Sequence, residues 1–309
     1  MLFRSAIIDL GTNTCNLLIA EFESSDFKIL HQSKQLVKLG DNKIKVNEIS
    51  PEATSRTLIA FRIFNEITKK FCVEEVRVIA TSAVRSAENK IEFLEKISSQ
   101  SGWIVKVISG EKEAELIFKG VLLAFQNLEN PSVIVDIGGG SNELIIANNK
   151  EMLWKESRPT GMARIINQFK ISVPIELSEI EILQNYFLNE HKSVFNKCAE
   201  NSVHTLIGCS GAFDTVADLI DEVEPGEKQR TTQNISIADF YDLYKVLVQS
   251  TREQRLKMKG MDFVRVDLIV PAIILIEKLI AEIGINKIFQ TDFALREGVL
   301  FEMMSTNSR

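Results

Sequence analysis

Two short polar segments, each set between apolar runs, carry the residues whose types could do chemistry. The first reads IDLGTNT over residues 8–14, and the second reads VDIGGGSNE over residues 135–143. An offset of 127 residues places Asp9 on Asp136 and also aligns the glycine that follows two residues later. An apolar run, a turn of Gly, Thr, Ser or Asn, and a second apolar run are typical of a β-hairpin. The agreement in residue type and gap indicates an internal duplication.

Such a turn is suited to binding phosphate. Glycine lets an anion approach the backbone N–H groups closely, and hydroxyl side chains add donors. A single hairpin of this kind is more often an ordinary tight turn, but two matching copies, each with an acidic residue ending its first strand, favour a phosphate site. We expect the two turns to face each other across a cleft and to hold opposite ends of a phosphate chain. The phosphate-binding candidates are Asp9, Thr12, Asn13, Thr14, Gly138, Gly139, Gly140, Ser141, Asn142 and Glu143, with Gly208, Ser210 and Gly211 in a third loop.

Two acidic residues of the second turn indicate a metal site. Asp136 stands at a strand end before three glycines, where a hard Mg²⁺ ion can bridge to phosphate oxygens directly or through water. Glu143 emerges from the far side of the same turn and can face the same space. The alternative for Asp136 is simple turn chemistry, because Asp is common before Gly. Asp136 and Glu143 are therefore the predicted metal ligands, and Mg²⁺ is the predicted cofactor.

The stretch between the two turns adds charged candidates. Arg85 lies in residues 80–89, after a predicted strand and before a predicted helix, where α/β proteins often contact ligands. It can clamp a phosphate bidentately, with a surface salt bridge as the alternative. Glu111, Glu113 and Glu115 open a later helix, where the macrodipole alone favours acidic residues. Glu111 and Glu115 share one helix face and Glu113 lies on another, and periodicity leaves open which face meets the cleft.

Composition narrows the class of protein. The chain has 309 residues, 45% of them apolar, and a formal charge of −6, which argues against a general nucleic-acid binder. Four scattered cysteines without a C-x-x-C pair indicate reduced thiols, and three histidines show no metal-binding spacing. There is no export signal, and the longest apolar stretch, residues 268–276, is too short for a membrane span. We expect a cytoplasmic protein that binds neither nucleic acid nor membrane.

The pattern of elements predicts an α/β fold in two similar halves. In the first half, the order is βββαβαβα, and the second half opens in the same way. The helix over residues 268–280 reads as core, with a dimer interface as the alternative. The remaining elements are strands near 27–30, 76–80, 103–108, 132–137, 143–147, 152–156, 205–208 and 287–290, with helices over 50–70, 89–99, 111–125 and 295–304, and a long helical region from 211 to 283.

Taken together, the motifs resemble those of the exopolyphosphatase / guanosine pentaphosphate phosphohydrolase family, within the sugar kinase–Hsp70–actin superfamily. The resemblance rests on the two turns, on ATSAVR at 80–85, SGEKEA at 109–114, RVDLIVP at 265–271 and LREG at 295–298. It implies two ribonuclease H-like (actin-like ATPase) domains with a cleft between them, over residues 1–127 joined by a C-terminal helix at about 294–309, and over 128–293. It also implies a short form without the C-terminal helical domain of larger members.

The resemblance also implies roles. Glu113 matches the catalytic glutamate that activates water, Arg85 the arginine of the A-T-S-A stretch, and Asp136 with Glu143 the acidic pair associated with Mg²⁺ and substrate. The implied reaction is Mg²⁺-dependent hydrolysis of the terminal phosphate of linear polyphosphate. The alternative is hydrolysis of the 5′ terminal phosphate of guanosine pentaphosphate. Three features depart from the family pattern: Asn16 where Arg is usual, Asn142 where Thr is commoner, and GCSG at 208–211 in place of a more glycine-rich loop.

Two further functions compete with hydrolysis. An ATP-dependent kinase of the same superfamily would need an adenosine pocket, for which residues 208–211 are the candidate. A non-catalytic sensor of polyphosphate or of a guanosine alarmone would have no use for a general base, so Glu113 argues against it. The predicted partners are a polyphosphate or guanosine polyphosphate substrate and a second copy of the chain in a homodimer.

Overall fold

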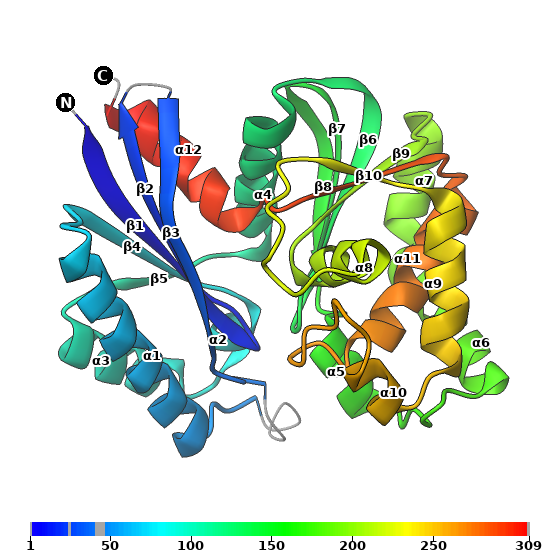
Figure 1. Cartoon of the computed structure of the whole chain (residues 1–309), viewed down its shortest axis with the longest axis horizontal. Coiled ribbons are helices and arrows are strands. Elements are labelled where there is room, and N and C mark those ends of the chain that lie inside the picture. The colour runs from blue at the N-terminus through cyan, green and yellow to red at the C-terminus, as the bar shows by residue number, and fades with distance from the viewer. Residues whose placement is uncertain (1, 24–25, 41–46, 308–309) are drawn as a thin grey trace. The chain divides into compact units, whose positions relative to one another are not determined.

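The chain folds into two compact units. The computed structural model describes residues 2–23, 26–40 and 47–307. Unit 1 comprises Met1–Gly120 and Leu295–Arg309, and unit 2 comprises Val121–Ala294 (Figure 1). The sequence places the boundary after residue 127, whereas the units divide at Gly120, within a helix. The predicted cleft concerns how the units are placed relative to one another, and it stays a prediction.

Unit 1 is built on a five-stranded sheet of order β3-β2-β1-β4-β5. β1, β2 and β3 form antiparallel pairs, while β4 and β5 run parallel to β1. Helices cover both faces of the sheet. The strands are β1 (Phe3–Leu10), β2 (Thr14–Glu23), β3 (Asp26–Leu36), β4 (Glu75–Ala80) and β5 (Val105–Val107); the helices are α1 (Pro51–Lys70), α2 (Ser82–Ser86), α3 (Lys90–Ser101), α4 (Gly110–Phe125) and α12 (Leu295–Asn307).

Unit 2 repeats this sheet with one strand added. Its order is β10-β11-β9-β6-β7-β8, so β8-β7-β6-β9-β11 follows the same path as the sheet of unit 1. The α/β prediction and the duplication are confirmed. The strands are β6 (Leu128–Ile137), β7 (Asn142–Asn149), β8 (Glu151–Arg158), β9 (Thr205–Cys209), β10 (Gln233–Ile235) and β11 (Lys287–Thr291); the helices are α5 (Met162–Gln168), α6 (Leu177–Glu190), α7 (Lys192–Glu200), α8 (Gly211–Asp221), α9 (Ile237–Gln249), α10 (Arg252–Leu256) and α11 (Ile269–Ile283).

Strand β1 shows why the sheet of unit 1 has two covered faces. Residues 5–8 are all buried, which is the pattern of a strand with helices on both sides rather than one facing water. Ala6, Ile8 and Leu10 belong to a core cluster with Phe61 of α1 and other residues of α1 and α3. Helix α12 contacts β1 and β2. The sheet thus holds the end of β1, and the turn that follows it, in a rigid setting.

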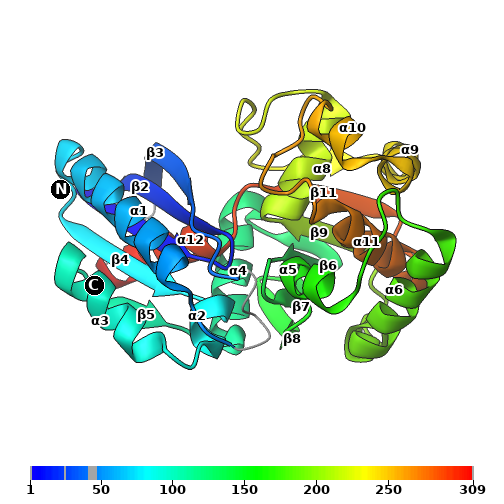
Figure 2. The same cartoon turned by 90° about the horizontal axis from the view of Figure 1, so that it is seen from below.

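Helix α11 forms the core of unit 2. Its residues Ile269–Ile276 are buried, and the helix contacts α5, α6, α7, α8 and α9 (Figure 2). The core interpretation of this apolar segment is confirmed. The long helical region expected over residues 211–283 is wrong in one respect, because it contains β10. That strand has only three residues and pairs with β11, a contact that local sequence does not reveal.

All four cysteines are free thiols, as predicted. Within residues 2–23, 26–40 and 47–307, none of the helices combines the length and the apolar character that crossing a membrane requires.

Gly298 lets α12 lie directly on α4. A Cβ at this position would overlap the carbonyl oxygen of Leu116, and that backbone group cannot move aside. Lys112 and Lys119 of α4 reinforce the contact, each donating to Oε1 of Glu302 at 2.6 Å. We expect Gly298→Ala to lower the free energy of unfolding by about 2 kcal/mol, through overpacking.

Urea denaturation followed by circular dichroism measures this change in stability. Ser305→Ala, at an exposed position of the same helix, is the control and should change stability by less than about 0.5 kcal/mol. Equal stability of Gly298→Ala and the unchanged protein would show that α12 does not rest on α4 in this way.

Candidate functional site

The parallel strands of unit 1 bring the predicted catalytic residues to one edge of the sheet. Leu10 of β1 pairs with Ala80 of β4, and Ala80 pairs with Val107 of β5. The turn after β1, helix α2 after β4 and helix α4 after β5 therefore all start from the same carboxyl edge. In open α/β sheets this edge is where ligands bind. Arg85 in α2 and Glu113 in α4 consequently meet, although 27 residues separate them in the chain.

Arg85 holds the Glu113 carboxylate in a fixed position. Nη1 of Arg85 donates to Oε2 of Glu113 at 2.9 Å and to the carbonyl oxygen of Ile108 at 3.0 Å. Glu113 is only 7% exposed, whereas Glu111 is exposed to solvent. The Glu113 side chain of α4 is thus buried and that of Glu111 is exposed, while the face of α4 that meets the predicted cleft stays a prediction. Because the Glu113 carboxylate is buried, the Arg85–Glu113 ion pair is not the surface salt bridge that was the alternative for Arg85.

The turn after β1 directs its carbonyl groups into the protein. Gly11 N–H donates to the Thr14 carbonyl at 3.0 Å and closes the turn. The Thr12 and Asn13 carbonyls accept from the backbone N–H groups of residues 37–40, at 2.7 to 3.3 Å. Among the described residues, no backbone acceptor takes the N–H of Thr12 or Asn13. Those donors are left to a ligand or to water.

The turn after β6 has the same construction. Gly138 N–H donates to the Ser141 carbonyl at 3.0 Å, the bond that the 127-residue offset predicts from the first turn. The carbonyls of glycines 138–140 accept from residues 162–164, through two backbone N–H groups at 3.0 and 2.9 Å and through Nε of Arg164 at 2.8 Å. In the part of the chain that the structure describes, the N–H groups of Gly139 and Gly140 have no backbone acceptor.

This shared geometry is the geometry of an anion site. When the carbonyls of a tight turn are bound on one side, consecutive N–H groups are left on the other and form a concavity that attracts oxyanions. The chain carries one such turn at the end of β1 and one at the end of β6. Both predicted β-hairpins are confirmed, and their free donors are those that a phosphate-binding turn requires.

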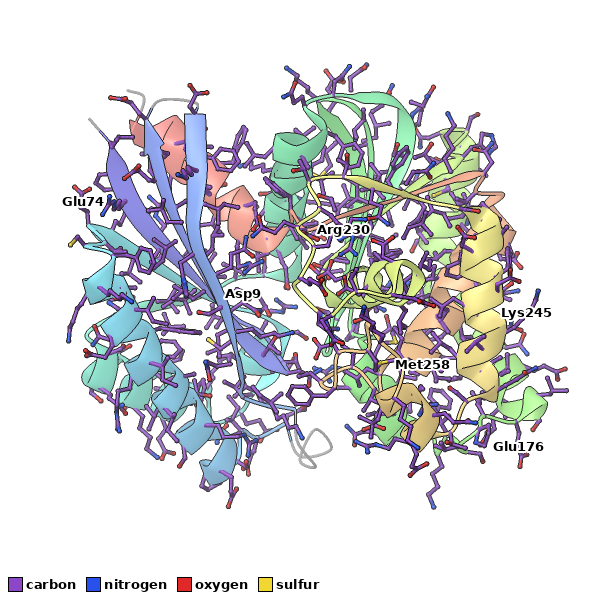
Figure 3. All side chains as sticks on the ribbon, in the orientation of Figure 1. Asp9, Glu74, Glu176, Arg230, Lys245 and Met258 are labelled. Atoms are coloured by element: carbon purple, nitrogen blue, oxygen red, sulfur yellow. The ribbon has the colours of Figure 1, made fainter. Side chains whose placement is uncertain are left out.

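Asp9 is the second-last residue of β1, one residue before the first of these turns (Figure 3). Its Oδ2 accepts from Nδ2 of Asn16 at 3.3 Å, and Asn16 also donates to Oγ1 of Thr14 at 3.3 Å. Its Oδ1 is buried and has no hydrogen-bond partner among the described residues. Burial raises the pKa of Asp9 to about 6, while the nearby Arg296 pulls it down. The carboxylate is therefore placed where a cation would stabilise its charged form.

Asp9 should make stability depend on pH. A raised folded pKa means that the folded state holds the proton more tightly than the unfolded chain, whose pKa is near 3.8. The contribution of protonated Asp9 to the stability of the folded state is fully present below pH 3.8, and it is lost as the pH rises through about 6. Asp9→Asn mimics the neutral acid, so its advantage over the unchanged protein should grow by about 2 kcal/mol between pH 4 and pH 7.5.

Urea unfolding of both proteins at the two pH values, with EDTA present, gives this difference. Asp26→Asn, at an exposed position of β3, is the matched control for the change of Asp to Asn. If the difference in the free energy of unfolding between Asp9→Asn and the unchanged protein did not vary with pH, the raised pKa of Asp9 would be wrong.

The acidic pair of unit 2 lies across a single hairpin. Asp136 and Glu143 are Cα partners in the β6–β7 ladder, and both are almost fully buried. Ser210 Oγ donates to Oδ2 of Asp136 at 2.8 Å, and Ser157 Oγ donates to Oε1 of Glu143 at 2.7 Å. The offset places Asn16 in unit 1 opposite Asp9, as Glu143 is opposite Asp136. The polar hydroxyl partners orient both carboxylates.

Asp136 and Glu143 suit a Mg²⁺ ion that also binds water and phosphate, and they do not suit a metal ion whose ligands all come from the protein. Among the described residues there is no group of three or more His, Cys, Asp or Glu side chains placed to hold a metal ion. Mg²⁺ usually keeps several waters and binds through one or two carboxylates plus substrate phosphates. Asp136, with Glu143 beside it, offers that number of carboxylates next to a turn whose N–H groups suit a phosphate.

The third predicted loop is packed by side chains of the same unit. Gly208 lies inside β9, and a Cβ there would overlap the ring of Phe213. A Cβ on Gly211 would overlap the guanidinium of Arg265. Ser210 adopts φ of 66°, an unusual value for a residue with a side chain. The loop is thus shaped to bring Ser210 to Asp136 and Arg265 to the start of α8.

Sequence reasoning missed two groups of residues that support these loops. One is the segment 160–164, which binds the carbonyls of the glycine turn and whose contact is purely tertiary. The only local signal for it is the Thr-Gly pair before α5, a usual helix start. The other is Arg230, labelled in Figure 3, which pairs with Asp218 at 2.6 Å and Asp221 at 2.7 Å and ties the loop after α8 to that helix.

Comparison with known proteins agrees with this geometry. The family model described as the Ppx/GppA phosphatase family matches residues 18–307. Solved structures include an exopolyphosphatase from Cytophaga hutchinsonii, with 36% identity, a TM-score of 0.93 and 98% of each chain covered. "Exopolyphosphatase 2" of Mycobacterium tuberculosis is 26% identical over 98% of this chain and 99% of its own length.

A third relative is larger than this chain. The "Bifunctional 3-dehydroquinate synthase/phosphatase" of Fusobacterium nucleatum is 29% identical over 91% of this chain, and the chain spans 44% of that relative's length. The family match extends over nearly the whole sequence and includes the turn after β6, whereas the turn after β1 precedes the matched residues. This chain belongs to the Ppx/GppA phosphatase family.

Proposed function

We propose that the protein is an exopolyphosphatase, which hydrolyses the terminal phosphate of linear inorganic polyphosphate. The observation that carries the proposal is the buried Glu113 carboxylate, held by Arg85 at the sheet edge where an anion-binding turn also starts. A carboxylate beside a phosphate site can activate water for hydrolysis, and a protein that only binds phosphate has no need of this role. The names of the Cytophaga and Mycobacterium relatives point to the same reaction.

In this proposal, Glu113 accepts a proton from the attacking water. Arg85 donates to Oε2 and so orients the carboxylate, and the bond from Arg85 to the Ile108 carbonyl keeps the guanidinium in place. Proton transfer to a positioned carboxylate contributes about 10²- to 10⁴-fold to a rate. The free N–H groups of the turns would bind phosphate oxygens and stabilise the charge that develops as the terminal bond breaks.

Asp136 and Glu143 are the residues that would hold Mg²⁺. When bound, the ion neutralises phosphate oxygens and so lowers the repulsion between the substrate and an attacking nucleophile. Ser210 fixes the Asp136 carboxylate for this role through its bond to Oδ2.

Guanosine pentaphosphate is the alternative substrate, because its 5′ chain ends in a similar phosphate. The kinase alternative is disfavoured by the third loop, where Phe213 and Arg265 occupy the space beside Gly208 and Gly211. The sensor alternative is disfavoured by the Arg85–Glu113 pair, which a binding protein would not need.

Phosphate release, measured side by side on short polyphosphate, long polyphosphate and guanosine pentaphosphate in Mg²⁺, tests the proposal. We expect kcat/KM to be higher for at least one polyphosphate than for the nucleotide. A higher kcat/KM for guanosine pentaphosphate would show that this nucleotide, and not polyphosphate, is the preferred substrate. Transfer of phosphate from ATP to polyphosphate, or tight binding without release, would identify a kinase or a sensor.

A further inference from the structure

A buried chain of hydrogen bonds leads from the glycine turn of unit 2 to a histidine. Nδ2 of Asn142 donates to the Thr160 carbonyl at 2.9 Å and lies 3.0 Å from Thr160 Oγ1. Thr160 Oγ1 in turn lies 3.2 Å from Nε2 of His191. Asn142 and His191 are fully buried and Thr160 is 1% exposed. None of these bonds is needed for a helix or a strand ladder.

Each end of this chain is attached to a rigid element. Asn142 is the first residue of β7 and directly follows the turn 138–141. His191 is the single residue between α6 and α7; its N–H donates to the Phe187 carbonyl, and its own carbonyl accepts from Val194 at 3.1 Å. The imidazole therefore starts from a fixed backbone position.

Thr160 stands between these anchors and precedes the segment that binds the turn. Gly161 packs so closely on the turn that a Cβ there would overlap the backbone of Gly139 and Gly140. Residues 162–164 then bind the three glycine carbonyls. The placement of residues 160–164 thus decides in which direction the N–H groups of the turn point.

His191 is suited to this task because it stays neutral. Burial, together with the nearby positive charge of Arg158, lowers its pKa to about 4. A neutral imidazole has one donor and one acceptor nitrogen, and the threonine hydroxyl can bond to either. A fixed, dry bond of this kind keeps its geometry better than one that exchanges with water.

We propose that Thr160 and His191 are positioning residues, which hold the glycine turn 138–140 in the geometry that presents its N–H groups to a substrate phosphate. The proposal deepens the proposed function and rests on it. Neither residue needs to touch the substrate, because Asn142 and the start of α5 transmit their effect.

The test compares variants that differ by one polar group. Thr160→Val keeps the shape and removes the hydroxyl, whereas Thr160→Ser keeps the hydroxyl. Thr57→Val, at a fully buried threonine of α1 whose hydroxyl donates to the Ala53 carbonyl, makes the same chemical change away from both turns. All are assayed for phosphate release from polyphosphate under conditions where each protein is folded.

We expect Thr160→Val to lower kcat about 10-fold, with a smaller change in KM, since a misplaced turn loses contacts in the transition state. Thr160→Ser and Thr57→Val should remain within about threefold of the unchanged protein. His191→Leu should resemble Thr160→Val, and the double variant should be no worse than either, because both break one chain.

Amide hydrogen exchange supplies a readout that does not depend on activity. The N–H groups of Met162 and Ala163 donate to the turn, so the peptide covering residues 159–168 should exchange about 10-fold faster in Thr160→Val and not in Thr57→Val. If the unchanged protein released no phosphate from any substrate, the proposed function would be wrong and exchange would still decide the positioning role. Unchanged exchange in Thr160→Val, or additive losses in the double variant, would overturn the proposal.

Discussion

Replacing Glu113 with Gln should lower kcat for phosphate release by about 10³-fold, within the range that a general base contributes. The amide keeps the shape of the side chain, and its oxygen can still accept from Nη1 of Arg85, so the local structure should be preserved. It cannot take a proton from water. Binding of polyphosphate should change little, because the donors of the two turns do not depend on this group. Steady-state phosphate release and equilibrium binding of labelled polyphosphate separate the two effects.

Glu111→Gln is the matched control for this experiment. Glu111 lies two residues away in the first turn of α4 and is exposed, so the same change there should leave kcat within about twofold. A large loss in both variants would point to a general effect of charge in this turn. Full activity of Glu113→Gln would remove Glu113 from the mechanism.

Asp136→Asn should lower phosphate release by about 100-fold and raise the Mg²⁺ concentration needed for half-maximal activity. The substitution replaces one carboxylate oxygen by an NH₂ group, which cannot bind a cation. Ser210 Oγ can still donate to the remaining oxygen if the amide is oriented suitably, so the fold of β6 should persist. Titration of the protein with Mg²⁺ by calorimetry, with and without a phosphate-chain ligand, measures the loss directly.

The control for Asp136→Asn is the same change at Asp239, an exposed residue in the first turn of α9. We expect normal Mg²⁺ dependence there. If Asp136→Asn bound Mg²⁺ as the unchanged protein does, the acidic pair would have a structural role only.

The hairpins show what a sequence reveals readily. Alternation of apolar runs with small polar turns is local, and its repetition after 127 residues carries over into matching sheets. Strand ends are also local, so the positions of Asp9 and Asp136 near the ends of β1 and β6 could be predicted, although Leu10 and Ile137 are the last strand residues. Helix α1 begins at Pro51, one residue after the predicted start at 50, and Ser50 is its N-cap.

Features that depend on tertiary contacts could not be predicted from the sequence. Helix α2 has only five residues and no side-chain cap at Thr81, and β3 extends far beyond the predicted 27–30 because it pairs along the whole of β2. Glu113 of α4 pairs with Arg85, 28 residues away in the chain, and helix periodicity does not reveal this contact. His191, a lone histidine in the sequence, is connected to the glycine turn only through the folded structure.

The attack of water on the terminal phosphorus is tested most directly by hydrolysis of polyphosphate in ¹⁸O-labelled water, with the products analysed by mass spectrometry. If Glu113 activates water for this attack, the label should enter the released orthophosphate, one atom per molecule, and the reaction should nearly disappear in Glu113→Gln. Label in the shortened polymer instead of in orthophosphate, or label uptake at the normal rate in Glu113→Gln, would contradict the account.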